Sequence, residues 1–290
     1  MKKVFLLITC WMAGMMWAQV PQGRVIEGLS MPSKITGYHV NYAIYLPPDY
    51  ETSKRSYPVV YLLHGYSDNE TAWIQFGEVH LTADRAIASR EIPPMIIVMP
   101  DAKVTFYVND AAGKDRYEDM FFQEFIPYIE KTYRIRGQKE FRAVSGLSMG
   151  GYGALIYALK HPDMFVACAP FSAAVWTDEE ILAMPSDGFI RRMERIGCTD
   201  LNNRLCENWR KNSVLDLVKT LPKEKIESVR FYIDCGDDDF LIKGNMALHA
   251  LMTDLKIKHE FRVRDGAHNW VYWRTGIGDA LKFIGESFHR

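Results

Sequence analysis

Short, continuous apolar runs recur along this chain and constrain its fold more than any other feature. They occupy residues 57–63, 95–99, 141–145, 165–170 and 229–235. Each run is separated from the next by a stretch in which apolar residues recur at helical spacing. Strands that are apolar along their whole length are buried on both faces, and the intervening helices cover them. The pattern therefore predicts an α/β fold with a mostly parallel central sheet and helices on both faces.

Ahead of these runs, residues 24–50 alternate between apolar and polar side chains. The clearest example is 38–46, which ends at Pro47 and Pro48. Alternation of this kind is typical of strands with one solvated face. We expect antiparallel N-terminal edge strands beside the parallel sheet.

Two stretches have the start and stop signals of helices. Residues 117–133 place apolar side chains at helical spacing, with acids toward the start and bases toward the end. Residues 150–160 are rich in small side chains that allow close packing on a sheet, and His161 and Pro162 stop the pattern.

Residues 176–221 are more polar and interrupt the rhythm of strands. Thr177 with Glu180 has the pattern of a capping box, and Ser213 precedes an apolar pair in the same manner. We interpret this segment as a helical insertion between strands. Two placements remain open, a roof over one side of a cleft and a simple surface excursion.

The chain begins with the pattern of a secretory signal. Lys2 and Lys3 precede an apolar run over 4–17, and this predicts a cleaved signal peptide over 1–18. The expected location is secreted or periplasmic, with no stable membrane association. A membrane anchor and lipidation at Cys10 are the alternatives.

Size and charge limit what the rest of the chain can be. With 290 residues, of which 48% are hydrophobic and 24% charged, the chain can bury one substantial core. We predict a single domain over 19–290. Loss of Lys2 and Lys3 would change the net charge from −1 to about −3. Such a balance does not attract nucleic acid, so we expect no nucleic-acid partner.

Four cysteines would remain after cleavage of the signal, and export would make disulfides possible. Cys198 and Cys206, eight residues apart in a polar stretch, are the pair that we expect to bond. Cys168 and Cys235 lie in apolar runs, which is typical of inert core thiols. No spacing resembles a zinc site, and we expect no metal.

Residues 146–150 read Gly-Leu-Ser-Met-Gly, directly after an apolar run and at the start of a helical stretch. This is the pattern of a nucleophile elbow, in which a serine is held exposed at a helix N-terminus. Gly146 and Gly150 leave the room that such a turn needs. Ser148 is therefore the candidate nucleophile, and the alternative is an ordinary helix N-cap.

A serine nucleophile needs a base and a group that orients the base. Asp239 and His268 each follow an apolar run, so each is expected at the carboxyl end of a strand. The chain order Ser148, Asp239, His268 is the order used by α/β-hydrolases. His268 could instead be a surface histidine, and the acidic run with Asp237 and Asp238 could be a solvated turn.

Two backbone N–H groups are candidate donors to an oxyanion, those of Met149 and Tyr66. Gly65 would let the chain turn sharply after the run 57–63 and aim an amide inward. His64 lies beside this turn and could act as a second base. We interpret it as a structural loop residue, because His268 fills that role in the expected order.

Aromatic side chains crowd the loops that would surround such a site. Rings stack on sugars and on aryl acids, so Trp270 and Trp73 are candidate substrate contacts. The alternative is that these rings fill space under long loops. The full set is Tyr66, Trp73, Trp270, Tyr272 and Trp273.

Short segments spread over nearly the whole mature chain match the motifs of a known family. They read Tyr-Leu-Leu-His-Gly at 61–65, Pro-Met-Ile-Ile-Val-Met-Pro at 94–100, Ile-Pro-Tyr-Ile-Glu at 126–130, Gly-Leu-Ser-Met-Gly-Gly at 146–151, Gly-Asp-Asp-Asp at 236–239 and Gly-Ala-His at 266–268. With these segments the chain resembles the esterase D-like α/β-hydrolases. Within them it is similar to the feruloyl and acetyl-xylan esterases of carbohydrate esterase family 1.

The resemblance implies an α/β-hydrolase fold and ester hydrolysis without a metal or organic cofactor. It implies Ser148 as nucleophile, Asp239 as acid and His268 as base. The expected function is a secreted serine esterase that acts on feruloyl or acetyl groups of plant-wall polysaccharide. An acyltransferase, a hydrolase of siderophore or other small esters, and a non-catalytic carbohydrate-binding protein remain as alternatives.

Overall fold

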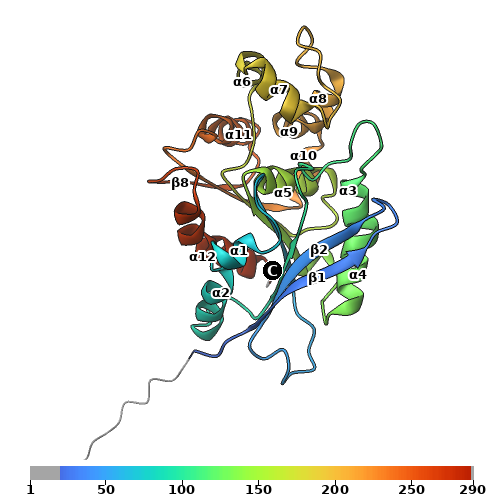
Figure 1. Ribbon diagram of the computed structural model, residues 1–290. Coiled ribbons are helices and arrows are strands. Elements are labelled where there is room, and N and C mark those ends of the chain that lie inside the picture. Colours follow the sequence, from blue (N-terminus) through green and yellow to red (C-terminus); the bar gives the residue numbers. More distant parts are fainter. Residues whose placement is uncertain (1–19, 289–290) are drawn as a thin grey trace, which may run out of the picture.

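The structure, a computed structural model, describes residues 20–288, and the signal peptide predicted over 1–18 lies outside the described residues. Its centre is an eight-stranded sheet in the order β1-β2-β4-β3-β5-β6-β7-β8 (Figure 1). β1 and β2 pair antiparallel to each other and β2 pairs antiparallel to β4, whereas the other pairs are parallel. The sheet thus confirms the predicted parallel centre and antiparallel N-terminal edge. The strands are β1 (Arg24–Pro32), β2 (His39–Leu46), β3 (Val59–Leu63), β4 (Ile96–Pro100), β5 (Arg142–Leu147), β6 (Ala167–Phe171), β7 (Arg230–Gly236) and β8 (Glu260–Arg264).

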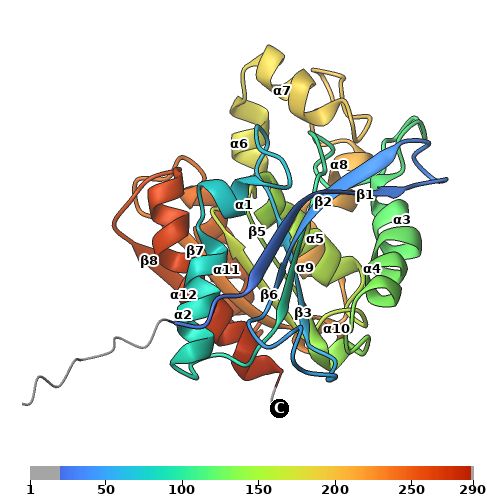
Figure 2. The ribbon, with the colours of Figure 1, turned by 60° about the horizontal axis from the view of Figure 1, so that its bottom comes forward.

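Helices cover both faces of this sheet, as the apolar strands require (Figure 2). In β3, Tyr61 and Leu63 point into one core cluster, while Val60 and Leu62 point into the other. On the first face lie α3 (Tyr117–Met120), η1 (Phe121–Phe125), α4 (Ile126–Thr132), α5 (Met149–Lys160), α9 (Val214–Thr220), α10 (Lys223–Glu227) and α11 (Ile242–Asp254). On the second lie α1 (Ala72–Gln75), α2 (Val79–Ala88) and α12 (Trp270–Ser287), and the 3₁₀ turn η2 (Lys139–Phe141) precedes β5.

The helix predicted over 117–133 is present but is interrupted at its centre. A π-helical turn, η1, separates α3 from α4. Pro127 lies at the start of α4 and has no N–H to donate to the carbonyl of Gln123, four residues earlier. A π turn just before the proline takes up this break in the hydrogen-bond ladder.

The segment 176–221 lies between β6 and β7 and is helical, as predicted. Besides α9 it forms α6 (Asp178–Ala183), α7 (Ser186–Met193) and α8 (Glu207–Asn212), which lie at the top of the molecule in Figure 1. The capping box is present, because Thr177 Oγ1 accepts from the N–H of Glu180 and the Glu180 carboxylate accepts from the N–H of Thr177. Ser213 Oγ accepts from the N–H of Asp216 at the start of α9.

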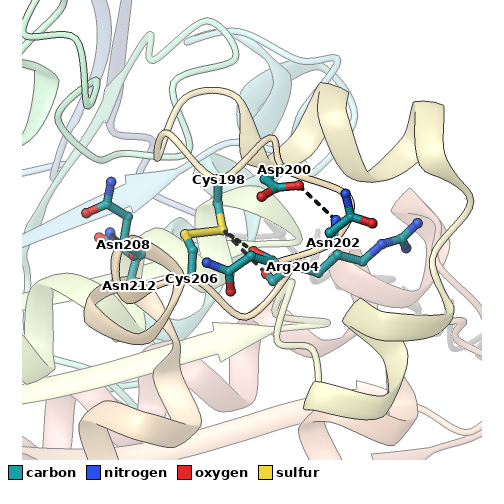
Figure 3. Close-up of a disulfide and its surroundings, with 8 residues drawn as sticks. Cys198, Asp200, Asn202, Arg204, Cys206, Asn208 and Asn212 are labelled. Atoms are coloured by element: carbon teal, nitrogen blue, oxygen red, sulfur yellow. Dashed lines mark hydrogen bonds between the residues drawn. A yellow bond between two sulfur atoms is a disulfide. The ribbon is translucent and has the colours of Figure 1, made fainter.

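Cys198 and Cys206 form a disulfide, with their Cα atoms 6.0 Å apart (Figure 3). This confirms the expected pairing. Cys168 and Cys235 are free and buried, as expected of core thiols. Within residues 20–288, none of the helices combines the length and apolar character needed to cross a bilayer.

Candidate active site

Ser148 forms a sharp turn between β5 and α5. Its backbone angles, φ 54° and ψ −115°, lie in a region that residues with a Cβ rarely adopt. The helix that follows lies very close to the sheet. A Cβ on Gly146 would lie 2.6 Å from the carbonyl oxygen of Gly150, and one on Gly150 would lie 2.5 Å from that of Leu63. Both glycines are therefore required for the turn that exposes Ser148.

The structure brings the three predicted residues together from the carboxyl ends of β5, β7 and β8. His268 Nε2 lies 3.0 Å from Ser148 Oγ, and His268 Nδ1 lies 2.8 Å and 3.0 Å from the two carboxylate oxygens of Asp239. An ionised carboxylate only accepts hydrogen bonds, so Nδ1–H donates to Asp239. Nε2 is then left as the acceptor of the Ser148 hydroxyl proton, which is the arrangement a general base needs.

Asp239 is buried, with 2% of its surface exposed, yet it is held in its charged form. Burial by itself would raise the pKa of Asp239. Hydrogen bonds from His268, from the Ser172 hydroxyl and from the N–H of Leu241 outweigh burial and lower this pKa below its ordinary value. Asp239 therefore stays an acceptor for His268 at neutral pH.

Ser172 is a site residue that the sequence analysis missed. It follows β6, has a positive φ of 43°, and its hydroxyl accepts from the indole N–H of Trp273 at 2.9 Å. The same hydroxyl is one of the groups that lower the pKa of Asp239. Its place at the carboxyl end of a predicted parallel strand was the signal that could have found it.

Two aromatic rings hold the imidazole of His268 from different sides. Trp273 contacts it edge-on, with ring centroids 4.9 Å apart, and Phe240 lies over it at 4.5 Å. Trp273 is buried, whereas 67% of the Phe240 surface is exposed. Phe240 thus forms an apolar rim beside the imidazole.

Tyr66 and Met149, the two predicted oxyanion donors, both line the same cleft as Ser148. The N–H of Met149 is in the first turn of α5, where helical amides have no carbonyl partner within the helix. His64 is buried and uses both ring nitrogens in structural bonds. Nε2 accepts from the N–H of Ala102 at 2.8 Å and Nδ1 donates to the carbonyl of Gly65 at 2.7 Å. This supports the interpretation of His64 as a residue that fixes the loop.

A cleft of about 660 Å³ opens over Ser148. The insertion forms one of its walls, because Trp176 precedes α6 and Arg191 and Arg192 come from α7. This favours the placement of the insertion over one side of the cleft, and not a simple surface excursion. The other lining residues are Gly65, Tyr66, Ser67, Asp68, Phe106, Leu147, Ser148, Met149, Ala174, Phe240, Leu241, His268, Asn269, Trp270 and Trp273.

The two tryptophans expected to contact substrate have different places. Trp270 lines the cleft. Trp73 is only 1% exposed and its indole N–H donates to the carbonyl of Leu63 at 3.0 Å, so the expectation that it contacts substrate is wrong. Its ring contacts Trp270 edge-on, with centroids 5.3 Å apart, and so supports the ring that does line the cleft. Tyr272 is also buried, and its hydroxyl donates to Asp234.

Asp237 and Asp238, the other members of the acidic run, are exposed and do not contact His268. With Asp265 they form the one group among the described residues whose ligand atoms could together hold a metal ion, all within 4.8 Å of one another. Asp237 also accepts from the N–H of Gly266 and so ties together the two loops that carry Asp239 and His268.

Comparison with known proteins places this site in a family. Residues 33–284 match the family model described as "Putative esterase". The chain is 27% identical over 235 residues to an acetyl esterase of Caldicellulosiruptor saccharolyticus, a match that covers 78% of this chain and 83% of the relative. It is 32% identical over 185 residues to an endo-1,4-beta-xylanase/feruloyl esterase of Xylanibacter ruminicola, covering 61% of this chain and 25% of that protein.

The solved structure of a ferulic acid esterase superposes with a TM-score of 0.78 at 34% identity, covering 92% of this chain and 99% of the other. The family match covers the strands β2 to β8 and the loops at the carboxyl edge of the sheet, and the superposition covers 92% of the chain. The chain belongs to the esterase D-like family of α/β-hydrolases, and it is a carboxylic-ester hydrolase.

Proposed function

We propose that this esterase removes feruloyl or acetyl groups from plant-wall polysaccharide through an acyl-enzyme on Ser148. The observation that carries the proposal is the hydrogen-bonded series from Ser148 Oγ through His268 to Asp239, with contacts of 3.0 Å and 2.8 Å. This is the geometry of a base-activated serine nucleophile.

In the proposed mechanism Ser148 Oγ attacks the ester carbonyl while His268 Nε2 takes its proton. The N–H groups of Met149 and Tyr66 donate to the oxyanion that forms. The ester bond to the sugar then breaks, and His268 gives the proton to the departing sugar oxygen. A water molecule, deprotonated by His268, attacks the acyl-enzyme. The bond from the acyl carbon to Ser148 Oγ breaks, this oxygen takes the proton from His268, and the free acid is released. Asp239 holds the imidazole in the required tautomer throughout.

The choice of substrate is supported by the cleft and by the relatives. Exposed or half-buried rings of Tyr66, Phe106, Trp176, Phe240 and Trp270 line the cleft, and such rings stack on sugars and on aryl acids. The relatives named as acetyl esterase and feruloyl esterase support the same two acyl groups.

The proposal includes export to the periplasm or the medium. The pattern over 1–18 supports it, and so does the disulfide between Cys198 and Cys206, since disulfides persist in oxidising compartments.

Side-by-side rates on methyl ferulate, an acetylated xylan and a longer-chain aryl ester test the proposal. We expect the first or second to be cleaved with the highest kcat/KM. Ser148→Ala should reduce kcat by about 10⁴ to 10⁶ while the protein stays folded by circular dichroism. Near wild-type activity of Ser148→Ala would remove this serine from the mechanism, and preference for the longer-chain ester would overturn the substrate assignment.

A transferase would use the same groups, with a sugar hydroxyl in place of water. Incubation of methyl ferulate with an acceptor xylo-oligosaccharide separates the two reactions. Hydrolysis predicts free ferulic acid as the main product, whereas transfer predicts a new sugar ester. A non-catalytic carbohydrate-binding protein would give neither product.

A further inference from the structure

The wall of the cleft contributed by α7 carries two arginines that the proposed chemistry does not use. Arg191 and Arg192 both line the cleft. Arg191 has no hydrogen-bond or ion-pair partner within the part of the chain that the structure describes, and Arg192 donates only to the carbonyl of Gly188 in its own helix. Neither guanidinium is neutralised by a carboxylate there.

The other arginines of the insertion are engaged. Arg195 pairs with Asp115 at 3.0 Å. Arg210 pairs with Asp178 at 2.8 Å and with Asp216 at 3.0 Å. Arg204 donates to the carbonyls at the end of α6. Three arginines thus hold the insertion together. The charges of the two arginines at the cleft, in contrast, remain free to interact with a molecule that enters the cleft.

The cleft offers these charges little internal competition. Asp68 is the one acid among its described lining residues. Burial raises the pKa of the Asp68 carboxyl group, which disfavours the charged form. The remainder of the lining is mainly aromatic and aliphatic. An anion entering the cleft would thus find two cationic groups and a single acid.

The arginines are also held in place rather than carried on a loose loop. Phe189 and Met193 anchor α7 in the core. The N–H of Cys198 donates to the carbonyl of Met193, and the disulfide to Cys206 closes the loop that follows the helix (Figure 3). Arg204 lies within that loop and contacts the ring of Phe189. The helix backbone that carries Arg191 and Arg192 is therefore fixed at the cleft, so only their side chains lose conformational freedom when an anion binds.

We propose that Arg191 and Arg192 bind a carboxylate of the substrate, so that this esterase prefers esters that carry an acidic group over matched neutral esters. The inference rests on the proposed function and narrows its substrate class. A guanidinium offers paired N–H donors that match the two oxygens of a carboxylate. The carboxylate can belong to the sugar side, as a uronic acid, or to the acyl side, as the half-ester of a dicarboxylic acid.

Two pairs of esters distinguish these sources. The first pair is an acetylated xylo-oligosaccharide with and without a glucuronic acid branch. The second is the 4-nitrophenyl half-ester of succinic acid and the neutral 4-nitrophenyl butyrate. For each pair the ratio of kcat/KM, acidic over neutral, is measured in the wild type, in Arg191→Gln, in Arg192→Gln and in the double variant. Lys131→Gln is the control, because it removes one positive charge from the last turn of α4, away from the cleft.

We expect a ratio above one in the wild type for one of the pairs, and that pair identifies where the carboxylate lies. The double variant should lower the ratio about tenfold, the low end for charged hydrogen bonds, because the site is open to solvent. Lys131→Gln should keep the wild-type ratio. A wild-type ratio of one or below in both pairs would overturn the inference. So would a double variant in which kcat/KM falls equally for the acidic and the neutral ester.

Binding to the inactive Ser148→Ala protein separates this inference from the proposed function. Calorimetry with the acidic and the neutral member of each of the two pairs requires no turnover. In the pair that shows the kinetic preference we expect tighter binding of the acidic member, lost in the Ser148→Ala protein that also carries Arg191→Gln and Arg192→Gln, and weakened by added salt. If the wild type cleaves none of the esters, the proposed function is wrong, and equal binding of the acidic and the neutral member in both pairs would refute the arginine site by itself.

Discussion

Ser148 shows how a strained residue is kept in place by its neighbours. A conformation of this kind costs about 1–3 kcal/mol and persists only where the surroundings determine it. Here the N–H of Ser148 donates to the carbonyl of Phe171, and its own carbonyl accepts from the N–H groups of Tyr152 and Ala174. These bonds tie the turn to the end of β6 as well as to α5, so the hydroxyl is presented at a fixed point.

The acid of the site can be tested within the run of three aspartates. Asp239→Asn replaces the acceptor with an amide whose NH₂ favours the wrong imidazole tautomer, with Nε2–H facing Ser148. We expect kcat on methyl ferulate to fall by about 10⁴ while KM changes little. The measurement is steady-state kinetics on folded protein.

Asp237→Asn and Asp238→Asn serve as matched controls, since both side chains are exposed and neither contacts His268. Each should keep kcat within about threefold of the wild type, as expected of surface substitutions. A large decrease of kcat in Asp238→Asn together with a small decrease in Asp239→Asn would show that Asp238, and not Asp239, is the acid.

At the scale of elements, features set by local pattern could be predicted from sequence and features set by tertiary contacts could not. The turn from β5 to α5 was predictable because Gly146 and Gly150 each lie only two residues from Ser148 in the chain. The burial of Trp73 was not, since it depends on a bond to Leu63 in a strand ten residues away. The π turn before Pro127 could be predicted only in part. The proline in the sequence indicates a break in the helix, but it does not indicate that the helix continues beyond the proline.

The same distinction applies to the cleft. The turn motif and the order along the chain were sufficient to select Ser148 and His268. Asp239 was selected from the acidic run mainly through the family motif Gly-x-x-Asp at 236–239. The insertion was visible as a helical segment, yet nothing local says which of its side chains face the site. That depends on how α7 packs through Phe189 and Met193.

The disulfide should stabilise the insertion without being needed for the fold of the sheet. For a loop of this length the constraint on the unfolded chain contributes about 2–3 kcal/mol. We expect the double substitution Cys198→Ser and Cys206→Ser to lower the midpoint of thermal unfolding, followed by circular dichroism, and to leave the spectrum of the folded protein unchanged.

Reductant supplies the control for this prediction. It should lower the unfolding midpoint of the wild type toward that of the double variant and leave the double variant itself unaffected. The thiols of Cys168 and Cys235 should not contribute, because burial raises the pKa of both and suppresses the reactive thiolate. A wild-type midpoint that does not respond to reductant would contradict a stabilising role for the disulfide.

At the scale of the whole molecule, stability toward acid depends on carboxylates that join distant elements. Glu118 in α3 accepts from Lys160 at 3.2 Å and contacts His161 at 3.0 Å, both at the end of α5. Burial by itself would raise the pKa of Glu118, but these two partners outweigh burial and hold the pKa below its ordinary value. The contact thus connects the helix that carries Ser148 to the helix beside it.

Because the folded-state pKa of Glu118 lies below the unfolded one, its contribution to stability is present above the unfolded pKa and is lost as pH falls through the folded pKa. Glu118→Gln should therefore lower the free energy of unfolding by about 2 kcal/mol at pH 7, and by less at pH 3, which lies below the unfolded pKa, where protonation removes part of this contribution from the wild type. Urea denaturation of both proteins at the two pH values measures this. Glu207→Gln is the control, because its ion pair with Lys211 lies in open solvent and should contribute nothing measurable at either pH. A difference between wild type and Glu118→Gln that stays constant from pH 7 to pH 3 would show that the side chain acts through packing, and the carboxylate would then have no part in joining α3 to α5.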